Sequence, residues 1–170
     1  ELILLSPAGS AAALVYGPAE PVAVVTGLPG APEVRRAILP AGARLWAVSD
    51  DGGSLLISVP AGEAEAIHLL DPEGGLHLLL STGETAAAAF LAGSGEAVIA
   101  DRSRDQVYWV RGAGAILPLA GPADGISEPI AVSVSRDHRR VFVANRATAT
   151  VAALDLAGGA ATLLACDCKL

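Results

Sequence analysis

Ser6-Pro7-Ala8-Gly9 is the first of four short segments that recur along the chain and decide its fold. The other three segments are Ser49-Asp50-Asp51-Gly52, Ala92-Gly93-Ser94-Gly95 and Ser135-Arg136-Asp137-His138. The last residues of the four segments lie at positions 9, 52, 95 and 138, so the interval is 43 residues each time. Each segment is rich in residues that favour turns and lies between two short apolar runs. We therefore interpret each segment as the turn that joins two β-strands.

The interval between these turns predicts the architecture. A repeat of this length that is composed of strands is typical of a β-propeller, in which each repeat forms one blade. The apolar runs predict four strands in each repeat. We expect an all-β fold of four-stranded antiparallel blades in one propeller domain, with blades at about residues 1–40, 41–82, 83–125 and 126–170. On the second strands of three blades, we expect Leu56, Val98 and Phe142 to belong to the core.

The composition is that of a folded protein with an apolar interior. Hydrophobic residues make up 52% of the 170 residues and charged residues only 17%, which excludes a disordered chain. No apolar run approaches the roughly 18 residues that a transmembrane helix needs, so we expect no membrane span. The net charge is −7, and the adjacent basic pairs Arg35-Arg36 and Arg139-Arg140 are isolated. Because proteins that bind nucleic acid carry a basic stripe, we expect no nucleic-acid partner.

Two cysteines, Cys166 and Cys168, lie near the end of the sequence. They cannot form a disulfide with each other without strain, because adjacent strand positions point to opposite faces. Two interpretations remain open: a disulfide to a cysteine beyond residue 170, or free thiols. The sequence contains no Met and begins inside an apolar run, so we expect a fragment of a bacterial protein. An extracellular or periplasmic location is favoured, and any signal peptide would lie upstream of residue 1.

Two stretches of the chain resemble known propeller repeats. Val98–Tyr108 resembles an NHL repeat, with an apolar residue, Ala and Asp before a turn and a strand after it. Val132–Asn145 resembles a YVTN-type repeat, and Val151–Asp155 is similar to the third strand of that repeat. The first two repeats depart from the pattern after their second strands, where Gly17-Pro18 and Val59-Pro60 replace the usual polar residue.

The resemblance to YVTN and NHL repeats implies more than four blades. Such families form rings of about six to eight blades, so the remaining propeller blades are expected outside this fragment. Without them, the fragment has two open ends. The resemblance also implies ligand binding, protein contact or, in some members, metal-dependent lactone hydrolysis, and it does not choose among these activities.

Charged residues are scarce in this chain, yet they gather in two loops. In a propeller, the loops after the second and fourth strands of every blade share one rim. Equivalent loops of adjacent blades lie side by side, so we predict one polar patch that binds a protein or a small polar ligand. The predicted patch consists of Asp101, Arg102, Arg104, Asp105, Asn145 and Arg146. The alternative interpretation is that Asp101 and Asn145 simply cap their own turns.

Candidate catalytic residues are few. Asp50, Asp51 and Asp137 lie in the predicted turns, and the pattern of glycines favours a turn over a Ca²⁺ site or an acid–base pair. His68 and His77 are predicted on opposite faces of one sheet, which argues against a shared metal. The sequence has no nucleophile elbow, phosphate-binding loop or dinucleotide fingerprint. We therefore expect no catalytic residue, no metal site and no cofactor.

Two functions of different classes remain. The favoured one is a non-catalytic β-propeller scaffold that binds a partner on one rim. The alternative is a metal-dependent propeller hydrolase of the lactonase type, which needs several oxygen ligands at the mouth of the channel. The predicted first strands carry no carboxylate, and Glu84 and Glu128, just before two of these strands, are the nearest candidates.

Overall fold

The computed structural model describes residues 1–17, 21–111, 114–158 and 160–165. Their strands form four separate four-stranded antiparallel sheets, which we number blade 1 to blade 4 along the chain. Helix in these residues is confined to short 3₁₀ turns such as Pro122–Asp124, and none of their helices is long and apolar enough to cross a membrane. The predicted all-β fold of four-stranded blades is thus confirmed. Cys166 and Cys168 lie outside the described residues.

Each blade uses four consecutive strands. Blade 1 contains β1 (Leu2–Leu5), β2 (Ala12–Val15), β3 (Val22–Thr26) and β4 (Glu33–Ala37). Blade 2 contains β5 (Arg44–Val48), β6 (Leu55–Ala61), β7 (Ala64–Leu70) and β8 (Leu76–Thr82). Blade 3 contains β9 (Thr85–Phe90), β10 (Ala97–Asp101), β11 (Gln106–Arg111) and β12 (Ala115–Ala120). Blade 4 contains β13 (Pro129–Val134), β14 (Arg140–Asn145), β15 (Thr150–Asp155) and β16 (Thr162–Ala165).

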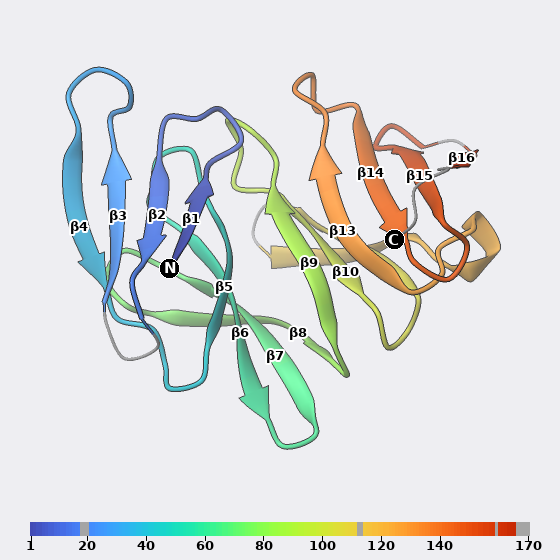
Figure 1. Cartoon of the computed structure of the whole chain (residues 1–170), viewed down its shortest axis with the longest axis horizontal. Coiled ribbons are helices and arrows are strands. Elements are labelled where there is room, and N and C mark those ends of the chain that lie inside the picture. Colours follow the sequence, from blue (N-terminus) through green and yellow to red (C-terminus); the bar gives the residue numbers. More distant parts are fainter. Residues whose placement is uncertain (18–20, 112–113, 159, 166–170) are drawn as a thin grey trace.

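The four blades lie side by side in an arc (Figure 1). Within each blade, the strands are hydrogen-bonded in chain order from the first strand to the fourth. The first strands of successive blades are in contact, since β1 contacts β5, β5 contacts β9, and β9 contacts β13. The fourth strands β4 and β16 lie at the two outer ends of the arc. The first strands therefore line the inner side of the arc, as expected for a propeller.

The turns between first and second strands are equivalent in blades 1, 2 and 4. The first residue of each turn donates its N–H to the carbonyl five residues later, at 2.9 Å for Ser6, 3.0 Å for Ser49 and 2.8 Å for Ser135. The fourth residue of each turn has a positive φ, namely 74° for Gly9, 65° for Gly52 and 57° for His138.

The corresponding turn of blade 3 departs from the predicted constant interval of 43 residues. Here the equivalent bond runs from Leu91 to Glu96 at 2.8 Å, so the turn begins one residue earlier than the sequence pattern predicts. The residue with positive φ is Gly93, at 63°, and not Gly95. Gly93 is the third residue of this turn, whereas Gly9, Gly52 and His138 are the fourth residues of theirs, so its positive φ lies one position earlier in the turn. The true intervals between equivalent residues are therefore 43, 42 and 44.

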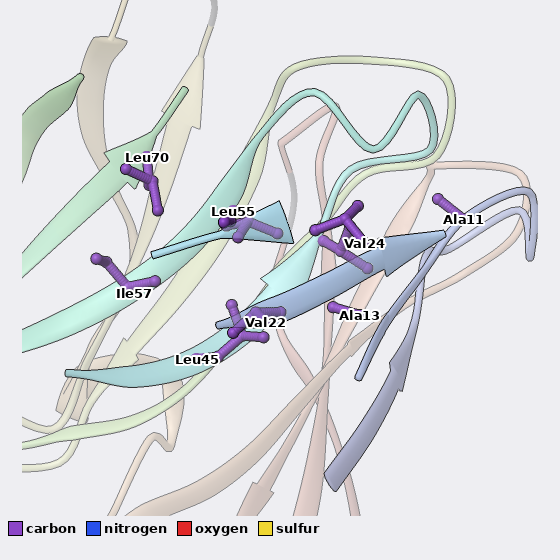
Figure 2. Packing of buried hydrophobic residues seen from close by; sticks show 10 residues of the cluster. Ala11, Ala13, Val22, Val24, Leu45, Leu55, Ile57 and Leu70 are labelled. Atoms are coloured by element: carbon purple, nitrogen blue, oxygen red, sulfur yellow. The ribbon is translucent and has the colours of Figure 1, made fainter. Parts of the chain in front are cut away.

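The core consists of apolar layers between consecutive blades. Figure 2 shows the layer between blades 1 and 2, in which β2 and β3 contribute Ala13, Val22 and Val24, and β5 and β6 contribute Leu45 and Leu55. Two similar layers lie between blades 2 and 3 and between blades 3 and 4. Because successive side chains of a strand point to opposite faces, each blade has a preceding face, toward the blade with the lower number, and a following face on the other side.

The second strands show how this alternation works. Leu56 and Val98 lie on the following faces of blades 2 and 3, and both are fully buried against the next blade, as predicted. Phe142 occupies the equivalent position of blade 4, but it is only half-buried. The expected core position is wrong for Phe142 because no further blade covers the following face of blade 4 in the described chain.

Candidate functional site

The predicted patch lies on two equivalent loops of adjacent blades. The loop between β10 and β11 begins at Arg102, and the loop between β14 and β15 begins at Arg146. Arg102 donates its N–H to the carbonyl of Glu84 at 2.9 Å, and Arg146 donates its N–H to the carbonyl of Glu128 at 3.0 Å. Each loop is therefore attached to the segment that enters the first strand of its own blade.

The same four residues also form side-chain ion pairs. Arg102 Nη1 lies 2.6 Å from Glu84 Oε1, and Arg146 Nε lies 3.0 Å from Glu128 Oε2. Three of these side chains are 45–59% exposed, and Arg102 is 29% exposed. Each arginine follows its glutamate by 18 residues, so the two pairs are structural repeats of one another. We call these four residues the Arg–Glu rim.

Asp101 is a buried structural residue. Its Oδ1 accepts hydrogen bonds from the Ser103 hydroxyl at 2.6 Å and from the N–H of Arg104 at 3.2 Å. Its Oδ2 pairs with Arg104 Nη1 at 2.8 Å, and this contact raises the pKa of Arg104. Arg104 also donates to the carbonyl of Ser81 in blade 2 at 2.9 Å. The carboxylate therefore caps its own turn, as the alternative interpretation proposed, and orients Arg104 toward the preceding blade.

Asn145 is also buried, but its hydrogen bonds reach beyond its own turn. Its Oδ1 accepts from the N–H of Ser127 at 3.1 Å, and its Nδ2 donates to the carbonyl of Gly125 and to Thr150 Oγ1, both at 3.2 Å. The side chain thus fastens the connection between blades 3 and 4 to β14.

Asp105 joins the two loops into one surface. Its carboxylate accepts the N–H of Glu128 at 2.6 Å, which links the loop of blade 3 to the entry segment of blade 4. Arg102 Nε adds a longer bond of 3.4 Å to the carbonyl of Pro129. The predicted patch therefore contains three residues that shape the loops, Asp101, Asp105 and Asn145, and three arginines with exposed surface. The sequence pattern did not include Glu84 and Glu128 in this patch, although their equivalent positions before β9 and β13 were the available signal.

On the opposite rim, hydrogen bonds to Asp50 connect neighbouring blades, which the sequence pattern did not predict. Asp50 Oδ1 accepts the N–H of Ala8 at 2.7 Å, and its Oδ2 accepts the N–H of Gly93 at 2.6 Å. These donors belong to the turns of blades 1 and 3, so the carboxylate of blade 2 connects three blades. Partial burial raises the pKa of Asp50, but the two N–H donors and the Ser6 hydroxyl outweigh burial and hold this pKa below its ordinary value.

Asp51 and Asp137 have the local role that was predicted for all three turn aspartates. Asp51 accepts from the Ser49 hydroxyl at 2.6 Å and from the N–H of Gly53 at 2.8 Å. Asp137 accepts from the Ser135 hydroxyl at 2.6 Å and from the N–H of Arg139 at 3.1 Å. In both turns the hydroxyl is the main cause of a lowered aspartate pKa. Sequence alone does not separate Asp50 from Asp51, because only the neighbouring blades distinguish them.

The histidines of blade 2 do not form a pair. His77 lies opposite Leu69 in the register of β7 and β8, as predicted, whereas His68 lies opposite Leu78. His77 Nε2 contacts Asp71 Oδ2 at 2.9 Å. Within the described ranges, no group of three or more His, Cys, Asp or Glu residues is placed to hold a metal.

A hollow of about 320 Å³ lies on the inner side of the arc, between the four first strands. Trp46, Phe90 and Val132 are among its lining residues, and Arg136 lies at its edge. The guanidinium of Arg44 stacks 3.9 Å from the centroid of the Trp46 ring. None of the described lining residues carries a carboxylate. The described lining of the hollow is therefore a mixture of apolar and polar groups, among them Ser133, Ser135 and Arg136, without a carboxylate.

Comparison with known proteins identifies the class through the fold. No protein-family model matches the chain, and no curated protein matches it in sequence. Streptogramin B lyase superimposes with a TM-score of 0.66 at 11% identity, over 98% of this chain and 54% of the lyase chain. TolB from Acinetobacter baumannii superimposes with a TM-score of 0.64 at 18% identity, over 96% of this chain and 42% of TolB. A chain of a nidogen/laminin complex gives 0.60 at 18% identity, over 91% and 59%.

These neighbours are β-propeller-like proteins, and the chain is a β-propeller of four-stranded blades. It spans about half the length of the structures that it matches. At identities below 25% the likeness establishes the fold and no particular activity. The resemblance to YVTN and NHL repeats stays a prediction.

Proposed function

We propose that the chain is a non-catalytic propeller scaffold that binds a protein or a small polar ligand through the Arg–Glu rim and Arg104. The observation that carries the proposal is the repetition of one exposed Arg–Glu pair at the same place on two adjacent blades. Exposed ion pairs contribute only about 0–1 kcal/mol to folding, so stability alone is a weak reason for them. For the same reason, each arginine exchanges its glutamate for a carboxylate of a partner at little cost.

The remaining residues of the predicted patch support this surface from below. Asp101, Asp105 and Asn145 use their polar atoms on the loops themselves, so they are not expected to contact a partner directly. A rim of alternating charges steers and orients a partner more than it raises affinity. Binding is therefore expected to weaken as salt shortens the range of the charges, between about 0.05 and 0.3 M.

The hydrolase alternative has less support. A lactonase-type metal site needs several oxygen ligands that converge on the channel, whereas the described residues lining the inner hollow offer no carboxylate. Glu84 and Glu128 are instead engaged with arginines on the rim.

The test compares three variants with the wild-type chain. The first, Arg102→Ala/Arg146→Ala, removes the cations. The second exchanges the members of both pairs, with Glu84→Arg/Arg102→Glu and Glu128→Arg/Arg146→Glu, so that net charge and internal pairing are kept while the pattern facing a partner is inverted. The control, Arg36→Ala/Arg139→Ala, removes the same charge from other exposed positions. Arg104 stays unchanged, because its removal would leave the buried Asp101 carboxylate without its ion pair.

Proteins retained by the immobilised wild-type chain from a cell extract are identified, purified and titrated against each variant. We expect the dissociation constant to rise by about tenfold or more for the first two variants and to stay unchanged for the control. Thermal unfolding of all variants should stay close to that of the wild type. A partner that binds the two rim variants as tightly as the wild type would show that the binding surface lies elsewhere.

A further inference from the structure

A hollow of about 430 Å³ lies between blades 2 and 3, and we call it the inter-blade hollow. Its floor includes core side chains such as Leu56 and Phe90, with exposed fractions of 0% and 1%, and its edge includes Leu78, which is 60% exposed. Small-molecule sites in proteins are concave, mostly apolar and about 300–1,000 Å³ in volume. Blades 2 and 3 each have a neighbouring blade on both sides, so the hollow belongs to the interior of the arc and not to its ends.

The junction between blades 1 and 2 has a side chain across the corresponding gap. Arg35 on β4 and His77 on β8 are equivalent, since each pairs with the third-strand residue that lies opposite the buried second-strand residue of its blade. Arg35 Nε donates to the carbonyl of Gly52 in the turn of blade 2 at 3.2 Å. His77 instead contacts Asp71 of its own blade at 2.9 Å. The equivalent position of blade 2 therefore leaves its gap open.

The junction between blades 3 and 4 differs at a second position. Trp109 on β11 is equivalent to Leu69 on β7, because each pairs with a fully buried second-strand residue, Val98 and Leu56 respectively. Trp109 packs against the apolar layer between blades 3 and 4, whereas the smaller Leu69 lines the inter-blade hollow. The hollow thus coincides with a smaller side chain at one repeated position and with a side chain turned to its own blade at another.

Arg111 supplies a charge at the edge of the inter-blade hollow. It is the one described lining residue with a permanent charge, and its side chain is 52% exposed. Its guanidinium stacks 4.6 Å from the centroid of the Trp109 ring, and its Nε lies 3.8 Å from Glu96 Oε1, which is too long for a hydrogen bond. Glu96 accepts the Trp109 Nε1–H at 3.1 Å. Among the described residues, no hydrogen-bond acceptor occupies the guanidinium, so its N–H groups can receive an anion.

We propose that the inter-blade hollow binds a small carboxylate with an apolar chain, with the carboxylate on Arg111 and the chain against the apolar floor. A guanidinium presents its N–H groups in the planar arrangement that a carboxylate matches. The floor favours a chain over a compact anion, because each methylene group removed from water adds to the affinity. This site is separate from the Arg–Glu rim, which lies at the other ends of the strands.

The experiment is a calorimetric titration of the purified chain with decanoate. We expect one site per chain with a dissociation constant below about 1 mM. Acetate, which has the same head group without the chain, should bind at least about tenfold more weakly, because it gains nothing from the apolar floor. Acetate that binds as tightly as decanoate would overturn the proposal.

Two substitutions test the two ends of the site. Arg111→Gln should weaken decanoate binding by about tenfold or more, because it removes the charge that pairs with the carboxylate. Its matched control is Arg139→Gln, at an exposed position of blade 4, which should leave binding unchanged. Leu69→Trp gives blade 2 the residue that blade 3 has at the equivalent position, and it should abolish binding by filling the hollow. Leu117→Trp, its matched control, adds the same side chain at an exposed position outside the hollow.

Gly95→Leu replaces Leu69→Trp if the circular dichroism of Leu69→Trp is not that of a folded β-protein. Gly95 lines the hollow, and a Cβ at this position would have no atom within 4 Å, so a larger side chain has room to enter. A wild-type chain that does not bind decanoate up to about 5 mM would overturn the proposal. Equal binding by the wild type, Arg111→Gln and the filled variant would overturn it as well, because exposed apolar side chains elsewhere would then hold the chain of the ligand.

Discussion

Replacing Asp50 by Ala tests whether contacts between turns hold the blades together. The substitution removes the acceptor of the N–H groups of Ala8 and Gly93, at 2.7 and 2.6 Å, and leaves the turn of blade 2 with its own acceptor, Asp51. Hydrogen bonds to a charged group contribute about 1.5–3 kcal/mol each when shielded from water. Both donors here are near solvent, which replaces part of each bond, so we expect a total loss of about 1–2 kcal/mol.

The assay is urea unfolding at pH 7, followed by the fluorescence of Trp46 and Trp109. The matched control is Asp137→Ala, because Asp137 accepts hydrogen bonds only within its own turn of blade 4. We expect a clearly smaller loss of unfolding free energy for the control. If Asp50→Ala costs no more than Asp137→Ala, the connection between the three turns does not stabilise the fold and the reasoning is refuted.

The same bridge predicts a pH dependence. The folded pKa of Asp50 lies below the ordinary value of 3.8, which applies to the unfolded chain. The stabilisation is therefore fully present above that value and is lost as the pH falls through the lower, folded pKa. Acidification from pH 5 to about pH 3 should reduce the stability of the wild type more than that of Asp50→Asn. Equal slopes for the two proteins would show that Asp50 titrates normally.

Further expectations concern the core and the turns. Leu56→Ala should cost about 2–5 kcal/mol, whereas Phe142→Ala should cost less than about 2 kcal/mol, because in the described chain no further blade covers Phe142 as blade 3 covers Leu56; urea unfolding measures both. Gly52→Ala should cost more than Gly9→Ala, because both positions have positive φ but only the new Cβ at Gly52 would clash with Thr26; a thermal midpoint for Gly52→Ala as high as that for Gly9→Ala would contradict this.

The strands and their order could be predicted from the sequence because they depend on local signals. Alternating apolar runs and turn-forming residues recur in each blade, and the resulting sheets are those observed. The turn of blade 3 was placed one residue too late, because the interval was counted to Gly95, whereas the turn runs from Leu91 to Glu96 and has its positive φ at Gly93. The pairing of Phe90 with Ala97 fixes the limits of this turn, and that pairing is a property of the folded sheet.

The parts of the candidate site that occupy equivalent positions in two blades could be predicted from the sequence. Asp101 and Asn145 follow the second strands of adjacent blades, so their neighbouring placement could be expected. Their complete burial could not, because it depends on segments that arrive from other parts of the chain. The contacts of Asp50 with the turns of blades 1 and 3 could not be predicted either, because its two backbone donors lie 42 and 43 residues away along the sequence.

The blades of the arc have unequal numbers of neighbouring blades, and this difference affects where local unfolding begins. In a linear array, each unit is stabilised by its own contacts and by those with adjacent units. Blades 2 and 3 have two neighbours, while blades 1 and 4 have one in the described chain. Local unfolding should therefore begin at the ends, and amide hydrogen exchange should be fastest in β1 and β16 and slowest in β6 and β10. In the described chain, the central pair of blades is then the last cooperative unit to open.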